Sequence, residues 1–255
     1  MRKFLILAGL VILALALHGL NRLAGDWHYT VPAEPGAVLY AAAFDALPDD
    51  WDLYEGRLSA QVEDGALVIE VGAASSLPFS TAAPYFDAFD LTVQAQAVDG
   101  PLNNGFGVVF RLRDPRNYFL FLVSSDGYYR VVREVDGVQR ELSTWIPSPA
   151  VNQGIGATNQ LRVTASGGEF RFYVNGEPLK LCVPDNPAGY STYNDLTGAC
   201  QEGRMVEALK DDSIASGRLG VIAMTLDEPD VRVLFDNLVV YGPDAANVTV
   251  TSAGE

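Results

Sequence analysis

The side chains that could carry out chemistry in this sequence are mainly carboxylates, because histidine is almost absent. The chain has two histidines, His18 in an N-terminal apolar run and His28 shortly after it. A Ser-His-Asp or Cys-His catalytic apparatus therefore cannot be built in the rest of the chain. Zinc sites that depend on imidazole are excluded there for the same reason. The sequence also lacks the GxxxxGK(S/T) loop that binds phosphates.

Carboxylates could instead cleave a glycosidic bond, which takes one protonated and one ionised acid on either side of that bond. The nearest acid cluster is LDEPDV, with Asp227, Glu228 and Asp230, and a proline interrupts it in a predicted turn. We therefore assign no catalytic residue and favour a non-catalytic protein. The enzyme that the sequence leaves open is a glycoside hydrolase that acts through carboxylates.

An aromatic and guanidinium patch is the main candidate for a binding site. Sugars present C–H faces that stack on aromatic rings and hydroxyls that bond to polar side chains. Arg111 and Arg133 fall on the less apolar faces of neighbouring predicted strands, and Tyr129 shares a face with Arg133. Trp145 begins the polar turn WIPSP. The alternative is that the rings pack at the edge of a core and that the arginines form ion pairs with nearby glutamates.

The elements that must position these side chains are predicted to be antiparallel strands. Asp-Gly or Asn-Gly pairs, which tolerate the positive φ angles of tight hairpin turns, recur between apolar runs. The runs alternate with a period of two residues, as strands do. We predict strands at 38–44, 58–63, 66–71, 89–97, 106–113, 118–124, 128–135, 138–142, 159–165, 169–174, 178–181, 218–225 and 231–241, and one short helix at 203–210. This pattern indicates an all-β, antiparallel β-sandwich.

Alternation also predicts the faces of individual strands. In 106–113, Phe106, Val108, Phe110 and Leu112 fall on one face, which we expect to be core. Residues 118–124 are apolar on both faces. That strand should therefore lie centrally in its sheet, with both of its faces covered.

Cys182 and Cys200 are the two cysteines of the chain. An even count downstream of an export signal predicts a disulfide formed in an oxidising compartment, and two reduced, buried thiols are the alternative. The bond would close a polar loop and contribute about 3 kcal/mol to stability.

The N-terminus predicts export. Arg2 and Lys3 precede an uninterrupted apolar run from Phe4 to Leu17, as in a signal peptide with its basic and hydrophobic regions. A cleaved signal peptide and a retained, hydrophobic membrane helix both stay open. We divide the chain into that segment (1–24), a linker (25–37), a sandwich domain (38–242) and a flexible tail (243–255). The domain is thus expected to be extracytoplasmic, either secreted or anchored to the membrane.

A formal net charge of −15 limits the partners. Nucleic-acid binding depends largely on Lys and Arg that displace counterions from phosphates, so nucleic acid is not expected as a partner. A carbohydrate or a surface protein is expected instead.

Several segments, taken in order, resemble a known family: FGVVFRLRDPRNYFLFLVSSDGYYRVVREVDG, TWIPSPAVNQG, NQLRV, FYVNGEPL, GRLGVIAM and VLFDNLVVY. Together they resemble the concanavalin A-like lectin/glucanase superfamily, and in particular its bacterial laminin G-like branch with 3-keto-disaccharide hydrolase domains. The resemblance implies a jelly roll with a curved sheet whose concave face often holds sugar. The E-x-D-x-x-E or E-x-D-x-E motif of the glucanases is not found here.

The resemblance also implies a structural calcium ion, because related sandwiches can share one between an Asp near the first strand and another near the last. Asp45 and Asp236 hold those positions here. The alternative is that both carboxylates accept backbone hydrogen bonds at strand ends. Two functions therefore stay open: a carbohydrate-binding module, and a membrane-anchored structural or protein-interaction domain without a small ligand.

Overall fold

A computed structural model describes residues 28–244 of the protein. The predicted signal peptide or anchor, the start of the linker and residues 245–255 of the tail lie outside this range. Within it, no helix is both long and apolar enough to cross a membrane. The first described residues lie against the sandwich, since the His28 ring stacks on Tyr85 and Val31 donates a backbone hydrogen bond to the Tyr85 carbonyl.

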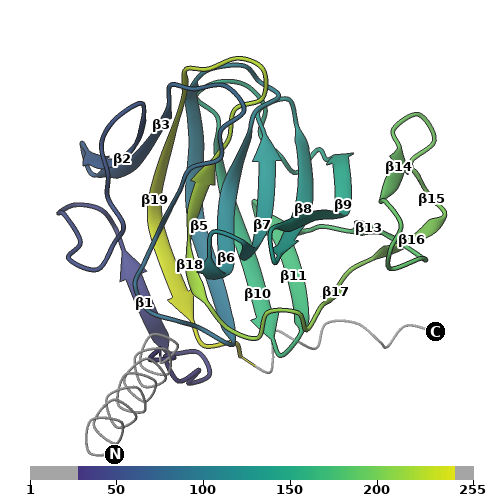
Figure 1. The fold of residues 1–255 in the computed structure, drawn as a ribbon, viewed down its shortest axis with the longest axis horizontal. Helices are drawn as coiled ribbons and strands as arrows, with labels where there is room; N and C mark the ends of the chain where they lie inside the picture. The colour runs from purple at the N-terminus through teal and green to yellow at the C-terminus, as the bar shows by residue number, and fades with distance from the viewer. Residues whose placement is uncertain (1–27, 245–255) are drawn as a thin grey trace, which may run out of the picture.

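Residues 28–244 form two large antiparallel sheets (Figure 1). One has nine strands: β1 (Val38–Ala42), β2 (Leu58–Glu63), β3 (Ala66–Val71), β5 (Phe89–Asp99), β10 (Thr158–Ser166), β11 (Glu169–Val174), β12 (Glu177–Pro178), β17 (Leu209–Lys210) and β19 (Val231–Tyr241). The other has six: β4 (Phe79–Thr81), β6 (Gly105–Asp114), β7 (Asn117–Ser124), β8 (Tyr128–Val135), β9 (Val138–Pro147) and β18 (Arg218–Ala223). The predicted all-β, antiparallel architecture is confirmed.

Strand order brings together segments that are far apart in the chain. The last strand, β19, pairs with β5 on one side and with β3 and β1 on the other. In the second sheet the order is β4-β18-β6-β7-β8-β9. β7 is therefore central, and seven of its eight residues are buried, as its apolar pattern predicted.

The main core lies between the two sheets. Phe110 stacks on Phe119 and meets Phe170 and Phe172 of the opposite sheet at ring distances of 5.2 to 6.0 Å. A smaller apolar cluster covers the other face of the six-stranded sheet, with Val109, Leu112, Leu120, Leu122 and Ile222 fully buried. The six-stranded sheet is thus apolar on both faces. The nine-stranded sheet carries ion pairs such as Arg162 with Asp90.

The predicted tight turns are present at three hairpins. Asp64-Gly65, Asp136-Gly137 and Asn175-Gly176 all have positive φ at both residues, as type I′ turns require. The prediction for Asn104-Gly105 was wrong, since Gly105 opens β6 instead of turning the chain.

The predicted helix at 203–210 was also wrong. Residues in this range form β16 (Gly203–Val206), which pairs with β13 (Leu181–Pro184), and β17, which pairs with β11. The intrinsic helix propensity of EGRMVEALK contributes less to stability than the backbone hydrogen bonds that these partner strands supply.

A disulfide between Cys182 and Cys200 confirms the predicted pairing. It joins β13 to β15 (Ala199–Gln201), which pairs with β14 (Thr192–Asn194). Strands β13 to β16 form an arm beside β9 (Figure 1). The arm bonds to β9 where Ser191 Oγ accepts from the Thr144 amide and Ser143 Oγ accepts from the Cys182 amide.

Candidate functional site

The four residues predicted to bind sugar do not meet in one place. Arg111 was expected on a partly open face, and this was wrong: its side chain is 1% exposed. A β-bulge explains the difference, because Arg111 has a φ of 50° and the pairing of β6 shifts on both sides here. The bulge turns Arg111 inward and moves Leu112 from the predicted core face to the opposite one.

Arg133 binds the segment 211–215, which we call the strap. Its Nη1 forms a 2.5 Å ion pair with the Asp211 carboxylate and lies 3.5 Å from Ser213 Oγ. Arg111 reaches the same strap, since its Nη1 donates to the Ile214 carbonyl at 2.6 Å. The two predicted arginines therefore come together, but as supports of one loop.

Tyr129 faces the main core and is 3% exposed, so its predicted place at an open face was wrong. Its hydroxyl donates to the Lys180 carbonyl. Burial raises the pKa of Tyr129 above its ordinary value, and the neighbouring Tyr193 adds to this effect. A neutral, buried tyrosine of this kind anchors the start of the arm.

Trp145 lies in the cluster on the other face of the six-stranded sheet and is partly exposed. The guanidinium of Arg130 covers its ring at 4.7 Å from the centroid, and Arg130 also approaches Glu141 at 3.6 Å. Burial lowers the pKa of Arg130, which the Glu141 carboxylate counteracts. Of the four predicted residues, Trp145 has the position that fits sugar contact best, although Arg130 already occupies one face of its ring.

The predicted calcium site at Asp45 and Asp236 has few candidate ligands. The Asp236 carboxylate accepts from the Asn237 amide at 2.6 Å and from Asn237 Nδ2 at 2.9 Å. Residues 28–244 contain no group of three or more His, Cys, Asp or Glu side chains that could hold a metal. Ca²⁺ usually takes about six to eight oxygen ligands. Calcium at Asp45 and Asp236 therefore stays a prediction with two candidate ligands.

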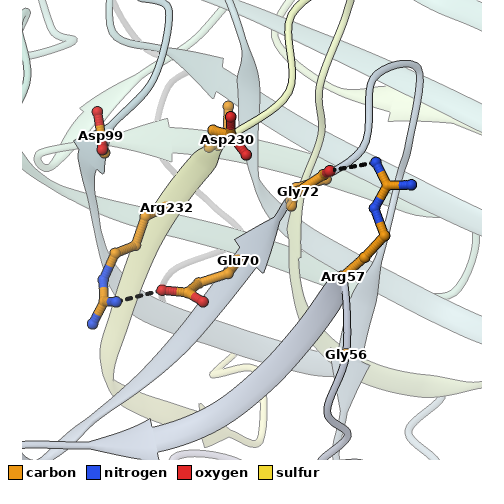
Figure 2. Close-up of a pocket in the computed structure, with 9 residues that line it drawn as sticks. Gly56, Arg57, Glu70, Gly72, Asp99, Asp230 and Arg232 are labelled. Atoms are coloured by element: carbon orange, nitrogen blue, oxygen red, sulfur yellow. Dashed lines mark hydrogen bonds and ion pairs between the residues drawn. The ribbon is translucent and has the colours of Figure 1, made fainter.

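A polar hollow of about 400 Å³ was not predicted, and we call it the upper hollow (Figure 2). It lies where β3 and β5 end and where β2 and β19 begin. Its lining consists of Gly56, Arg57, Glu70, Val71, Gly72, Asp99, Asp230, Val231 and Arg232. Its volume is in the range of small-molecule sites, and no aromatic ring contributes to it.

Two of the charged side chains at the upper hollow are already engaged. Arg232 binds Glu63 at 2.7 Å and also Glu70, and these glutamates raise the pKa of Arg232. Arg57 donates through Nη2 to the Gly72 carbonyl at 2.9 Å, which leaves its other N–H groups without a partner in the described residues (Figure 2).

The two aspartates are less engaged. Asp99 accepts from the Gly100 amide at 2.8 Å, and the Asp230 carboxylate has no hydrogen bond or ion pair within residues 28–244. Figure 2 shows both aspartates above Arg232 and Glu70 in this view. The site therefore offers unpaired acceptors from the aspartates and unpaired donors from Arg57.

The backbone at the hollow requires glycine. A Cβ at Gly72 would lie 2.9 Å from the Arg57 carbonyl oxygen, and the Gly72 amide donates to that oxygen at 2.7 Å. This close contact holds Arg57 at the hollow. The sequence signal for the site was the acid cluster before the last strand, which includes Asp230. Arg57 and Asp99, which line the same hollow, could be assigned to the site only once the strand order was known.

The fold is a β-sandwich of two antiparallel sheets. No family model matches the chain, and no curated protein matches it. Among solved structures, a Bacillus subtilis protein of unknown function with a galectin-like fold matches at a TM-score of 0.55 and 13% identity, over 82% of this chain and 97% of that chain.

Two further structures come from carbohydrate-active systems. The carbohydrate-binding module CBM66 from Bacillus subtilis matches at a TM-score of 0.50 and 14% identity, over 75% of this chain and 95% of that chain. A GH43 protein from Bacillus licheniformis matches at 0.52 and 14% identity, over 79% of this chain but 39% of that chain. At such low identity these likenesses show the fold alone.

Proposed function

We propose that the protein is a non-catalytic, carbohydrate-binding domain that takes a neutral sugar in the upper hollow. The observation that carries the proposal is the pair of aspartates, Asp99 and Asp230, which face the hollow without a cationic partner while Arg57 keeps free N–H donors there. Sugar hydroxyls can donate hydrogen bonds to the two aspartates and accept hydrogen bonds from Arg57.

The charges at the hollow favour a neutral ligand. An anion would meet Asp99, Asp230 and the −15 net charge of the chain. A cation would meet the guanidinium of Arg57, which has no carboxylate partner within residues 28–244. Because the lining has no aromatic ring, binding would depend on hydroxyl groups more than on stacking. A single sugar residue, such as the end of a glycan chain, matches a hollow of about 400 Å³.

Three finer assignments belong to this proposal. The fold likeness to a carbohydrate-binding module and a galectin-like protein supports the concanavalin A-like superfamily and its jelly roll. The Cys182–Cys200 disulfide supports an extracytoplasmic location, because such bonds persist in oxidising compartments. The apolar run from Phe4 to Leu17 supports export, with or without retention as an anchor.

The test is a glycan array screen of the domain, followed by calorimetric titration of the best neutral glycan. Loss of one hydrogen bond to a charged group costs about 1.5 kcal/mol, so Asp230→Asn and Arg57→Ala should each weaken binding roughly tenfold. Asp64→Asn is the matched control, since Asp64 is an exposed aspartate in the turn at the far end of β3. Equal affinity in Asp230→Asn, Arg57→Ala and the control would contradict the site.

A protein-interaction domain is the second candidate, and one observation favours it. The arm presents Tyr190 and Leu196 with exposures of 84% and 97%. Large apolar side chains exposed in this way are typical of binding surfaces when they gather in patches. A glycan array without any signal would favour this second function.

A further inference from the structure

Arg232 lies between two strands that each place a carboxylate opposite it. In the nine-stranded sheet β19 runs between β3 and β5, and Arg232 is the register partner of Glu70 on β3 and of Asp99 on β5. The register with β5 shifts just beyond this pair, between Arg232 and Val233. Side chains opposite each other on antiparallel strands lie about 5 Å apart at Cβ, and opposite charges there attract. Arg232 can therefore reach a carboxylate on either side.

In the structure the Arg232 side chain has turned to the β3 side alone. Its Nη1 binds the Glu70 carboxylate, and its Nη2 lies 2.7 Å from Glu63 Oε2. Glu70 is opposite Ser59 on β2, and Glu63 lies further along β2, at the turn that joins β2 to β3. The guanidinium thus lies along the sheet, away from the end at which Asp99 closes β5. Figure 2 shows its link to Glu70.

This arrangement leaves Asp99 without a cation. Its carboxylate accepts from the Gly100 amide at 2.8 Å and forms no ion pair within residues 28–244. Asp99 is exposed and lines the upper hollow. Two carboxylates on one side of Arg232 attract the guanidinium more strongly than a single one on the other side. Both glutamates accordingly raise the pKa of Arg232.

We propose that Glu63 and Glu70 are positioning residues for the upper hollow, which hold Arg232 away from Asp99 and so keep that carboxylate open to a ligand. This inference rests on the function proposed for the hollow. It gives a role in binding to Glu63, which does not line the hollow itself. Without the two glutamate charges, Arg232 turns to Asp99 and occupies the acceptor that a sugar hydroxyl would use.

The first measurement needs no ligand and follows the Asp99 carboxyl carbon in carbon-13 NMR spectra of the full chain. In Glu63→Gln with Glu70→Gln this signal should shift, because a guanidinium now binds the carboxylate. Adding Arg232→Met should return the signal to its original position, and Arg232→Met alone should leave it unchanged. The carboxyl carbon of Asp126, in the turn between β7 and β8 of the other sheet, is the internal control.

These variants should keep the fold. The side chains of Glu63 and Glu70 are 41% and 46% exposed, and ion pairs at the surface contribute little to stability. The second measurement is calorimetric titration with the neutral glycan that the array selects. The double glutamine variant should bind it about tenfold more weakly, since one charged acceptor is lost, and the further change Arg232→Met should restore the affinity to within about twofold.

The outcomes separate this inference from the proposed function. An Asp99 signal that does not move in the double variant, or that stays shifted after Arg232→Met, overturns the inference. A shift at Asp230 in place of Asp99 also overturns it, because Arg232 would then have turned to another carboxylate. Unchanged glycan affinity in the double variant overturns the positioning role. An array without any bound glycan contradicts the proposed function, while the carbon-13 spectra still decide where Arg232 turns.

Discussion

Arg111 connects three loops at the lower end of the sandwich. Its guanidinium binds the backbone carbonyls of Asp87, Gly167 and Ile214, which lie in separate turns. A buried cation has a desolvation cost, and burial accordingly lowers the pKa of Arg111. Nearby aspartates counteract that shift, and the carbonyls satisfy most of the donors. The residue therefore stabilises these three segments against one another.

Replacing Arg111 should destabilise the fold. Arg111→Met keeps the length of the side chain but leaves three carbonyls without their donor, so we expect the free energy of unfolding to fall by about 3 kcal/mol. Urea denaturation measures the change. Arg204→Met is the control, because Arg204 is 73% exposed and pairs loosely with Asp185 at 3.6 Å. Equal stability of the two variants would show that Arg111 is not a structural connection.

The face of the strand on which each side chain lies was predicted less well from the sequence than the strands themselves. Alternation assigned Phe106, Val108 and Phe110 to the core correctly. It failed from Arg111 onward, because one bulged residue reverses the face of all that follow. It also placed Tyr129 on a partly open face of β8, whereas Tyr129 packs inward and Arg130 lies on the other face. Neither error could be avoided without knowing the partner strands.

At the scale of elements, the arm covers the edge of the six-stranded sheet. β9 is the last strand of that sheet, and an exposed edge strand can pair with other chains. Ser191 accepts from the Thr144 amide, and Arg140 donates to the Pro187 carbonyl. The disulfide fixes the arm that makes these contacts. Its position therefore protects the fold from association through β9.

Removing the disulfide should loosen the arm and lower stability. The bond closes a loop with a sequence separation of 18 residues, so Cys182→Ala with Cys200→Ala should lower the free energy of unfolding by about 3 kcal/mol. Hydrogen exchange should become faster in β14, β15 and β9. Amides of β5, in the other sheet, serve as the internal control. Unchanged exchange in β9 would mean that the arm holds its place without the bond.

Most strands could be predicted because local and long-range signals agree there. β2, β3, β8, β11 and β19 begin and end where alternation placed them. Their ends coincide with Gly-bearing turns such as Asp64-Gly65, whose backbone conformation few other pairs adopt. β16 could not be predicted, because its extended backbone depends on pairing with β13. β13 ends at Pro184, well before β16 begins at Gly203. The upper hollow depends in the same way on strand order.

At the scale of the whole molecule, tyrosines in several parts of the fold share one property. Burial raises the pKa of Tyr54 to about 12, and the pKa values of Tyr40, Tyr118 and Tyr129 are raised further. In the unfolded chain a tyrosine has a pKa near 10.0. The folded state therefore holds protons that the unfolded state releases.

Stability should fall as the pH rises above 10. Below the unfolded pKa the tyrosine contribution is fully present, and it is lost as the pH rises toward the folded values. We expect phenolate absorption and loss of β-sheet dichroism to appear together in an alkaline titration. Complete ionisation of all tyrosines with the dichroism unchanged would contradict this expectation.

The place of β19 in the nine-stranded sheet has a consequence for synthesis. The strands on either side of it, β3 and β5, leave the ribosome well before Val231 does. Until then they have no backbone partner on the side that β19 later fills, and their pairing to it spans most of the chain. Long-range pairing of this kind makes folding slow. The nascent chain must therefore keep these strands incompletely paired until β19 has been made.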